Sequence, residues 1–190
     1  MKNNKSKSKT KKPLYSFDTK ENKKLRLYIT VASILTAAII AVIGQRLVPI
    51  KKLYDAASLE EFIWRAVVVV LGMAACLAAH EGIHILMLKK LHGYSTDTGF
   101  DKAYPYIGSK DTFEKRNYVL LSLAPVAVIL IVLIALLLVV NESWFWVVYI
   151  ILIMHVAGSV GDFYCAYKIL TQKEEIKIKD DGKTVDILKK

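Results

Sequence analysis

Residues 66–88 read AVVVVLGMAACLAAHEGIHILML, an apolar run of 23 residues broken by two histidines and one glutamate. A helix needs about 20 apolar residues to cross a bilayer. Three further runs of similar character cover residues 27–44, 118–140 and 143–167, so the four runs make up close to half of the chain. The sequence therefore predicts an all-α membrane protein with four transmembrane helices.

The composition agrees with this prediction. The chain of 190 residues is 54% hydrophobic, yet it carries a net charge of +10 and its mean hydropathy is still +0.36. Apolar and charged residues must therefore be segregated along the chain, which excludes an ordinary soluble domain and a wholly disordered chain. Both cysteines, Cys76 and Cys165, lie inside apolar runs, which excludes a disulfide framework.

The charged segments define the expected domain organisation. Residues 1–26 contain ten Lys and Arg and predict a disordered basic cytoplasmic tail that contacts anionic lipid headgroups. Residues 27–170 form the four-helix transmembrane domain, and residues 171–190 form a charged cytoplasmic tail in which residues 176–188 suit a small hairpin. The first tail has no nucleic-acid fold signature, so we expect membrane contact and no nucleic-acid partner.

Lysine and arginine also predict the orientation in the membrane. The N-terminal tail, the connection at residues 46–59, the long loop with its Lys89-Lys90 flank, the link at residues 141–143 and the tail from Lys168 onward carry 10, 3, 6, 0 and 7 of them. Because cytoplasmic segments are enriched in Lys and Arg, both termini and the 93–117 loop are expected in the cytoplasm of a multi-pass cell-membrane protein.

The polar segments contain several local signals. Ser58 and Glu61 suit a capping box that begins the second helix, and Asp111 with Glu114 is expected to cap the third. In the 93–117 loop, residues 103–107 are β-prone and allow a small β-hairpin.

Aromatic residues cluster at the start of the fourth apolar run. Trp144, Trp146 and Tyr149 are expected to mark the membrane interface there, because Trp and Tyr are enriched at that depth.

The second run contains His80-Glu81-Gly82-Ile83-His84, an H-E-x-x-H sequence. On a helix, residues four apart share a face, so both imidazoles can bind one ion while Glu81 lies beside it as a base. Ionisable residues inside a transmembrane helix are costly and by default indicate function. The alternative is a pair of helix-interface histidines that hydrogen-bond to neighbouring helices.

A catalytic zinc ion usually takes three protein ligands and one water. Asp162 is the other acidic residue buried in an apolar run, and both Asp162 and His84 lie about 10–12 Å from the cytoplasmic end of their helices. Pro125 falls at the same depth in the third helix, where it can open room by a kink. Gly158 and Gly161 are expected to let the fourth helix approach another helix closely.

Two further histidines, His155 and His92, are not expected to bind the ion. His155 lies about 10.5 Å above Asp162 along the helix, too far to bind the same ion without strain, so it is expected as a polar neighbour. A hydrogen bond from His155 to a reacting carbonyl and a satisfied core histidine are both open. His92, beside Gly93 at the end of its helix, is expected to be structural.

The H-E-x-x-H sequence in a membrane helix, Ala124-Pro125 in the next helix and the later Gly161-Asp162 resemble the site-2 protease clan of intramembrane zinc metalloproteases. Within it the chain is most similar to a family of small bacterial membrane proteins described as "putative zincin peptidases". The resemblance covers residues 62–170 and implies a three-helix core around Zn²⁺. It also implies two His and one Asp as ligands, and a Glu that activates water. The better-known members carry Gly after the third ligand, where this chain has Phe163.

The sequence thus favours an intramembrane zinc metallopeptidase that acts on a membrane-embedded protein or peptide. In this hypothesis His80, His84 and Asp162 hold Zn²⁺, and Glu81 and His155 are catalytic. The alternative is a catalytically inactive membrane protein that uses the metal site as a scaffold or to bind a partner.

Overall fold

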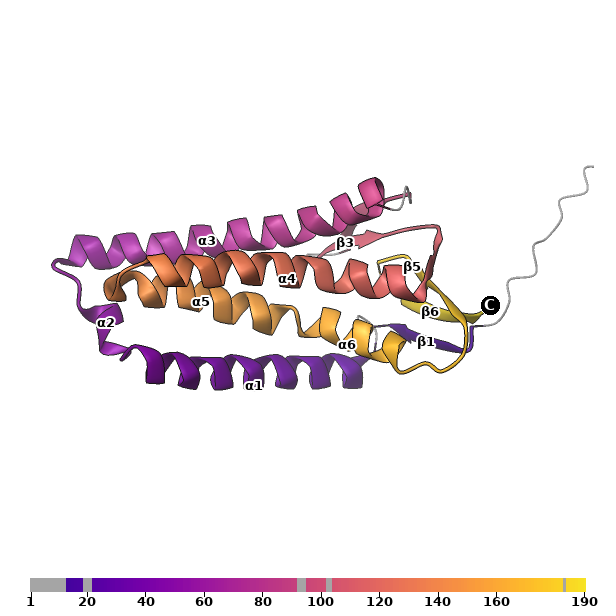
Figure 1. Ribbon diagram of the computed structural model, residues 1–190, viewed down its shortest axis with the longest axis horizontal. Helices are drawn as coiled ribbons and strands as arrows, with labels where there is room; N and C mark the ends of the chain where they lie inside the picture. Colours follow the sequence, from indigo (N-terminus) through magenta and orange to yellow (C-terminus); the bar gives the residue numbers. More distant parts are fainter. Residues whose placement is uncertain (1–12, 19–21, 92–94, 102–103, 183) are drawn as a thin grey trace, which may run out of the picture.

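The structure is a computed structural model that describes residues 13–18, 22–91, 95–101, 104–182 and 184–190. Four helical spans lie side by side and form one elongated bundle (Figure 1). Each span is long and apolar enough to cross a membrane, as the sequence predicts. The helices are α1 (Lys23–Leu47), the short α2 (Lys51–Tyr54), α3 (Leu59–Leu86), α4 (Lys115–Val139), α5 (Glu142–Gly158) and α6 (Val160–Leu170), and a π-helical turn η1 (Met87–Leu91) continues α3.

The fourth span is two helices rather than the single one expected. At the break, the Ser159 hydroxyl donates a hydrogen bond of 2.8 Å to the backbone oxygen of His155. A serine that bonds back to the preceding turn often bends a helix, and the adjacent Gly158 and nearby Gly161 ease the bend. The break separates His155, on α5, from Asp162, on α6.

A four-stranded antiparallel sheet lies at one end of the bundle, in the order β1-β6-β5-β4. It joins three segments that are far apart in the sequence. The predicted hairpin of residues 176–188 is confirmed as its centre. The strands are β1 (Tyr15–Asp18), β4 (Thr112–Glu114), β5 (Ile176–Asp180) and β6 (Thr184–Lys189).

The disorder expected for residues 1–26 is wrong for the described part of that segment. β1 pairs with β6, where Phe17 lies opposite Val185, and α1 already begins at Lys23. Burial explains this, because the Phe17 side chain is only 3% exposed. An apolar side chain that is removed from water on a paired strand stabilises a segment whose charge alone suggests disorder.

The sheet packs on the bundle through one face. Alternate residues of each strand point toward the helix ends, as the period of two in a strand requires. Together with Leu25, Leu88, Tyr118 and Ile169 of the helices they form one apolar cluster. The strand residues in it are Phe17, Phe113, Ile176, Ile178, Val185 and Ile187.

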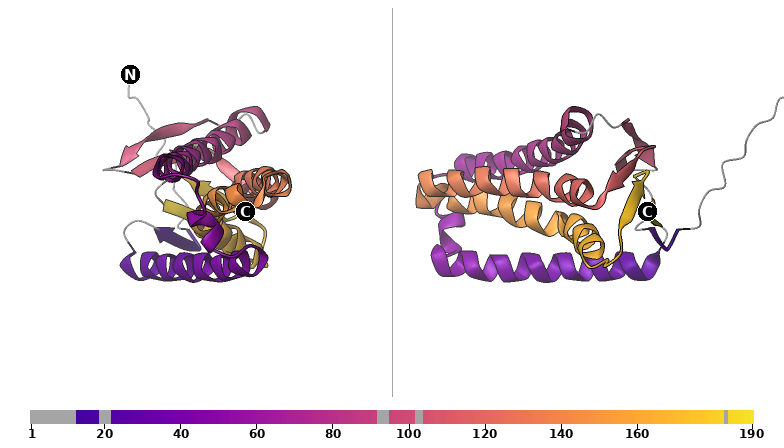
Figure 2. Two further views of the ribbon diagram at one scale, coloured as in Figure 1. Left: turned by 90° about the vertical axis from the view of Figure 1, so that its left-hand side faces the viewer. Right: turned by 45° about the vertical axis from the view of Figure 1, so that its right-hand side comes forward.

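The predicted hairpin in the 93–117 loop is also confirmed: β2 (Asp97–Asp101) pairs with β3 (Tyr104–Gly108). The Ser109 N–H donates a hydrogen bond of 2.8 Å to the Asp180 backbone oxygen. Gly108 approaches Asp181 so closely that an added Cβ would lie 2.1 Å from its carbonyl carbon. The loop hairpin therefore abuts the turn of the C-terminal hairpin (Figure 2).

The expected helix caps differ in detail. Ser58 accepts a hydrogen bond of 3.2 Å from the Glu61 N–H, as expected. The Glu61 carboxylate, however, accepts its hydrogen bond from the Ala57 N–H and not from the Ser58 N–H that a capping box would use. The cap expected from Asp111 and Glu114 is wrong. Glu114 is the N-cap of α4 but makes no side-chain cap bond, and Asp111 instead accepts hydrogen bonds from Ser95, which lower the pKa of its carboxyl.

Trp146 and Tyr149, expected to mark the membrane interface, are not exposed on the outside of the bundle. Their side chains are 3% and 5% exposed, and both pack inside the bundle. The Trp146 indole donates to the Val48 oxygen at 3.1 Å, and the Tyr149 hydroxyl donates to the Ile40 oxygen at 2.8 Å. A buried Trp or Tyr needs such a partner for its polar atom, and here the partners are backbone carbonyls of α1 and of the segment after it.

Candidate metal centre

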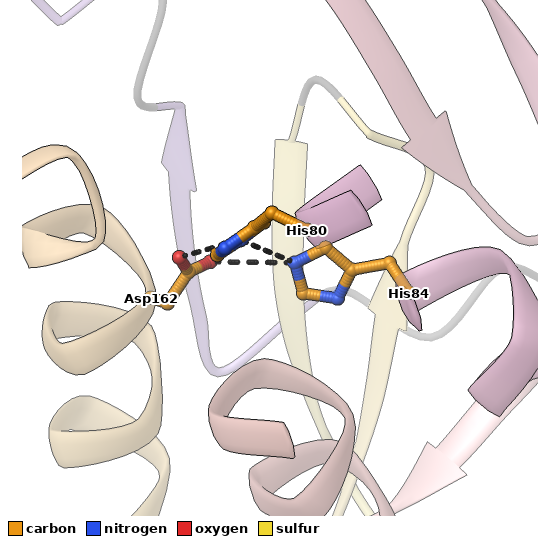
Figure 3. Close-up of side chains that lie close together, drawn as sticks. All are labelled: His80, His84 and Asp162. Carbon is orange, nitrogen blue, oxygen red and sulfur yellow. Dashed lines mark hydrogen bonds and ion pairs between the residues drawn. The ribbon is translucent and has the colours of Figure 1, made fainter. Parts of the chain in front are cut away.

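Three side chains from two spans meet near the sheet end of the bundle. His80 and His84 lie one turn apart on α3, and Asp162 lies in the first turn of α6. One donor atom of each residue lies within 4.8 Å of the other two. Figure 3 shows the three side chains converging from the two helices. Among the described residues this is the group of His, Cys, Asp and Glu that suits a metal ion.

The individual distances fit a zinc ion. The two Nε2 atoms of His80 and His84 are 3.2 Å apart. Asp162 places Oδ2 3.3 Å from the His80 Nε2 and Oδ1 3.8 Å from the His84 Nε2. Two ligands on a tetrahedral zinc ion, each about 2.0–2.1 Å from it, are about 3.3–3.4 Å apart. Two imidazole nitrogens and one carboxylate oxygen are also a donor set that zinc accepts.

The predicted meeting of His84 and Asp162 at one depth is therefore observed. It follows from the constant rise of about 1.5 Å per residue in both helices. Phe163, the departure from the better-known pattern, does not displace Asp162 from the group, since its own side chain is 44% exposed and points outward.

An outer contact near the centre comes from α4, where the Val126 oxygen lies 3.4 Å from the His155 Nε2. Pro125 directly precedes Val126 inside α4 and is completely buried. The sequence indicated that Pro125 lies at this depth, but not that the backbone of Val126 contacts a histidine.

His155 is closer to the centre than its position along the helix suggests. Its ring centroid lies 5.5 Å from that of His80, in an edge-to-face contact, although no donor atom of His155 joins the group of three. A carbonyl oxygen only accepts hydrogen bonds, so the proton of a neutral His155 lies on Nε2, toward Val126. Its Nδ1 is then an acceptor. This geometry places His155 as a polar neighbour of His80. His92, expected to be structural, lies outside the described residues.

Glu81 lines a groove of about 630 Å³ between α3 and α5–α6, together with all three members of the group and His155. Its carboxyl is half-buried and interacts electrostatically with His80 and Asp162. A carboxyl beside the group but outside it can exchange protons with a molecule in the groove.

The expectation that Gly158 and Gly161 permit close helix packing is wrong. A Cβ built on either glycine meets nothing within 4 Å, and both residues line the groove. The glycines therefore keep this side of α5–α6 open beside the centre. Close packing is found instead at Gly44 and Gly72, where an added Cβ would lie 2.2 Å from Tyr149 and 2.4 Å from Ile151.

A family model described as "Putative zincin peptidase" matches residues 73–177, more than half of the chain. The chain belongs to this family. The match contains the H-E-x-x-H sequence, Pro125, His155 and Asp162, so the family region includes the whole centre. The description of this zincin-like family suggests a zinc metallopeptidase. No curated protein and no solved structure matches the chain.

Proposed function

We propose that this protein is an intramembrane zinc metallopeptidase that hydrolyses a peptide bond of a membrane-embedded substrate. The observation that carries the proposal is the group of His80, His84 and Asp162, whose donor atoms fit zinc. The group lies on spans long enough to cross a bilayer and borders a groove that Glu81 also lines. Membership of a zincin-like family supports the same chemistry.

In this proposal one group of residues binds the ion and another transfers protons. His80, His84 and Asp162 would hold Zn²⁺, which when bound supplies a water of lowered pKa and an electrophile for the scissile carbonyl. Glu81 takes the proton of the attacking water and returns it to the leaving amine. His155 orients His80 by its edge contact, and in its protonated form it could also donate to the reacting carbonyl.

The substrate must present an extended peptide bond, because a helix hides its backbone. The β2–β3 hairpin has two strands, so each has one edge that pairs with no other described strand. β3 contacts α3, which carries His80 and His84. We propose that an unwound substrate segment adds to this hairpin as a further strand.

The sheet end of the bundle is proposed to face the cytoplasm. The N-terminal segment, the 93–117 loop and the C-terminal segment all contribute strands at this end. They carry 10, 6 and 7 Lys and Arg, with Lys89 and Lys90 counted to the loop, against 3 and 0 in the two connections at the other end. Lys110 and Ala57 are exposed at opposite ends. In a background without Cys76 and Cys165, an impermeant thiol reagent on intact cells should label A57C and spare K110C; the reverse result would invert the orientation.

The central test separates the base from the ligands. Glu81→Gln should keep zinc, fold and membrane insertion, since an amide replaces a carboxyl of equal size that is not needed to hold the ion. Peptidase activity on a co-expressed membrane substrate should fall by at least about 100-fold, the usual contribution of general acid–base catalysis.

Two control variants complete this test. Asp162→Ala should lose both zinc and activity, because a ligand is removed, whereas Cys165→Ala should keep both. Full activity in Glu81→Gln would contradict the mechanism. Zinc binding without peptidase activity in the unmodified protein would favour the metal-binding scaffold.

A further inference from the structure

The helix of the fourth span is interrupted at Ser159, between α5 and α6 (Figure 1). The backbone of Ser159 has φ −82° and ψ 5°, whereas a residue inside an α-helix has ψ of about −42°. Ser159 follows His155 by four residues and precedes Asp162 by three. The geometry at this one residue therefore decides how both side chains approach α3.

His155 and Asp162 contact the same histidine of α3 from opposite sides of the break. The Asp162 Oδ2 lies 3.3 Å from the His80 Nε2, and the ring centroids of His155 and His80 are 5.5 Å apart. In an unbroken helix, His155 and Asp162 would lie about 10.5 Å apart along the axis, since each residue adds about 1.5 Å. Two side chains with that separation reach a single imidazole more readily when the helix between them is bent.

The Ser159 side chain is bonded to α5 and not to the helix that it precedes. A serine directly before a helix commonly caps it by accepting from an N–H of the first turn, but Ser159 makes no such bond to α6. Its hydroxyl donates instead to the His155 oxygen at 2.8 Å, and its own N–H donates to the same oxygen at 3.0 Å. The Ser159 oxygen accepts from the Phe163 N–H at 3.1 Å. Ser159 is therefore bonded to both helices, and its hydroxyl ties the break to the backbone of His155.

A second buried serine shows that such a bond alone does not break a helix. The Ser122 hydroxyl donates at 3.1 Å to the backbone oxygen four residues earlier, as the Ser159 hydroxyl does. Ser122 and Ser159 are 6% and 2% exposed, yet α4 continues through Ser122. At Ser159 the helix is also weakened by Gly158 and Gly161, because glycine destabilises a helix interior. The glycines allow several bends, and the hydroxyl bond selects one of them.

We infer that Ser159 is a positioning residue of the candidate metal centre: the bond from its hydroxyl to the His155 oxygen holds the bend that brings Asp162 to the histidines of α3. The inference rests on the proposed function only for the identity of the ion. The bend itself belongs to the metal-free chain.

Three variants of the full-length protein in detergent micelles test this role. Ser159→Ala removes the hydroxyl and keeps the backbone. Ser159→Thr keeps a hydroxyl that can donate to the same oxygen, as threonine does in helices. Ser122→Ala is the matched control, because it removes the same kind of bond from an unbroken helix that carries none of the three candidate ligands.

The first measurement is zinc affinity by chelator competition. It should fall about 10–100-fold in Ser159→Ala, the usual size of effect when a residue that orients a metal ligand is lost. It should stay near that of the unmodified protein in Ser159→Thr and in Ser122→Ala.

The second measurement follows the bend without metal. In a background without Cys76 and Cys165, spin labels replace Lys89 of η1 and Tyr167 of α6, which are both exposed. Pulsed electron paramagnetic resonance then gives the distribution of distances between the end of the α3 span and α6. This distribution should broaden in Ser159→Ala and keep the unmodified width in the other two variants.

Unchanged zinc affinity and distances in Ser159→Ala would overturn the inference, and so would a loss of affinity with unchanged distances, since the effect would not pass through the bend. Equal losses in Ser122→Ala would overturn it because any buried serine bond would then matter. Equal losses in Ser159→Thr would overturn it because the hydroxyl would not be the group that matters. If Ser159→Ala does not fold, Ser159→Gly replaces it as the variant without a donor. If the unmodified protein binds no zinc, the proposed function fails, while the distance measurement still decides the inference.

Discussion

The two sides of the α5–α6 span are built in opposite ways. On the side of α1, Tyr149 lies directly over Gly44 and donates to the Ile40 oxygen, so the two helices are in close contact. On the side of α3, contact is close at Gly72 and Ile151, but nearer the sheet Gly158 and Gly161 face open space in the groove. Glycine thus permits close contact at Gly44 and Gly72, and preserves a cavity at Gly158 and Gly161.

This comparison indicates where the molecule places stability and where it places function. The packed side buries aromatic rings and satisfies their polar atoms with backbone carbonyls. The open side holds ionisable side chains at hydrogen-bonding distances beside unfilled volume, an arrangement typical of a binding site.

The largest expected effect comes from adding bulk at matched glycines. Gly44→Leu places a side chain where Tyr149 already lies, so we expect a loss of stability of about 1–3 kcal/mol or more and a clearly lower melting temperature in micelles. At Gly161 an added Cβ meets no atom within 4 Å, and Gly161→Leu removes a helical glycine, so its stability should be equal or higher by up to about 1 kcal/mol.

Peptidase activity should be affected in the reverse order, more by Gly161→Leu than by Gly44→Leu. Gly161→Leu should retain zinc but cleave substrate far less, because the leucine fills part of the groove beside Asp162. Folded Gly44→Leu should cleave at a rate close to that of the unmodified protein. A marked loss of stability in Gly161→Leu would show that this side of α5–α6 is packed and not open.

The sequence predicted the four spans and the residues of the candidate centre because both depend on local rules. Hydrophobic run length identifies a span, and the helical rise places His84 and Asp162 at one depth. The missed features depend on partners far away in the chain. β1 needs β6, about 170 residues later, and the burial of Tyr149 needs Gly44 on another helix. Which face Gly158 and Gly161 present likewise depends on where α3 lies.

A smaller effect, on the pH dependence of stability, is expected from the hydrogen bonds that two tyrosines of the helical spans donate to different acceptors. The Tyr149 hydroxyl donates to the neutral Ile40 carbonyl, whereas the Tyr118 hydroxyl donates at 2.7 Å to the Asp180 carboxyl. Asp180 ends β5 at the contact between sheet and bundle, and burial raises the pKa of its carboxyl to about 6 from an ordinary value of 3.8. One acceptor titrates and the other does not.

The sign of the resulting pH dependence follows from proton binding. Between pH 4 and 6 the folded protein keeps a proton on Asp180 that the unfolded chain releases, so this group contributes stability that is complete below about pH 4 and lost as pH rises through about 6. Asp180→Asn can still accept from Tyr118 and the Gly182 N–H but cannot ionise. Its melting temperature relative to the unmodified protein should therefore rise steadily from pH 4 to pH 7.

Tyr149→Phe is the matched control. It removes one hydrogen bond to a neutral acceptor, which contributes about 1 kcal/mol, and should lower stability equally at every pH. A difference between Asp180→Asn and the unmodified protein that does not change with pH would show that the Asp180 carboxyl is ionised in the folded protein throughout this range.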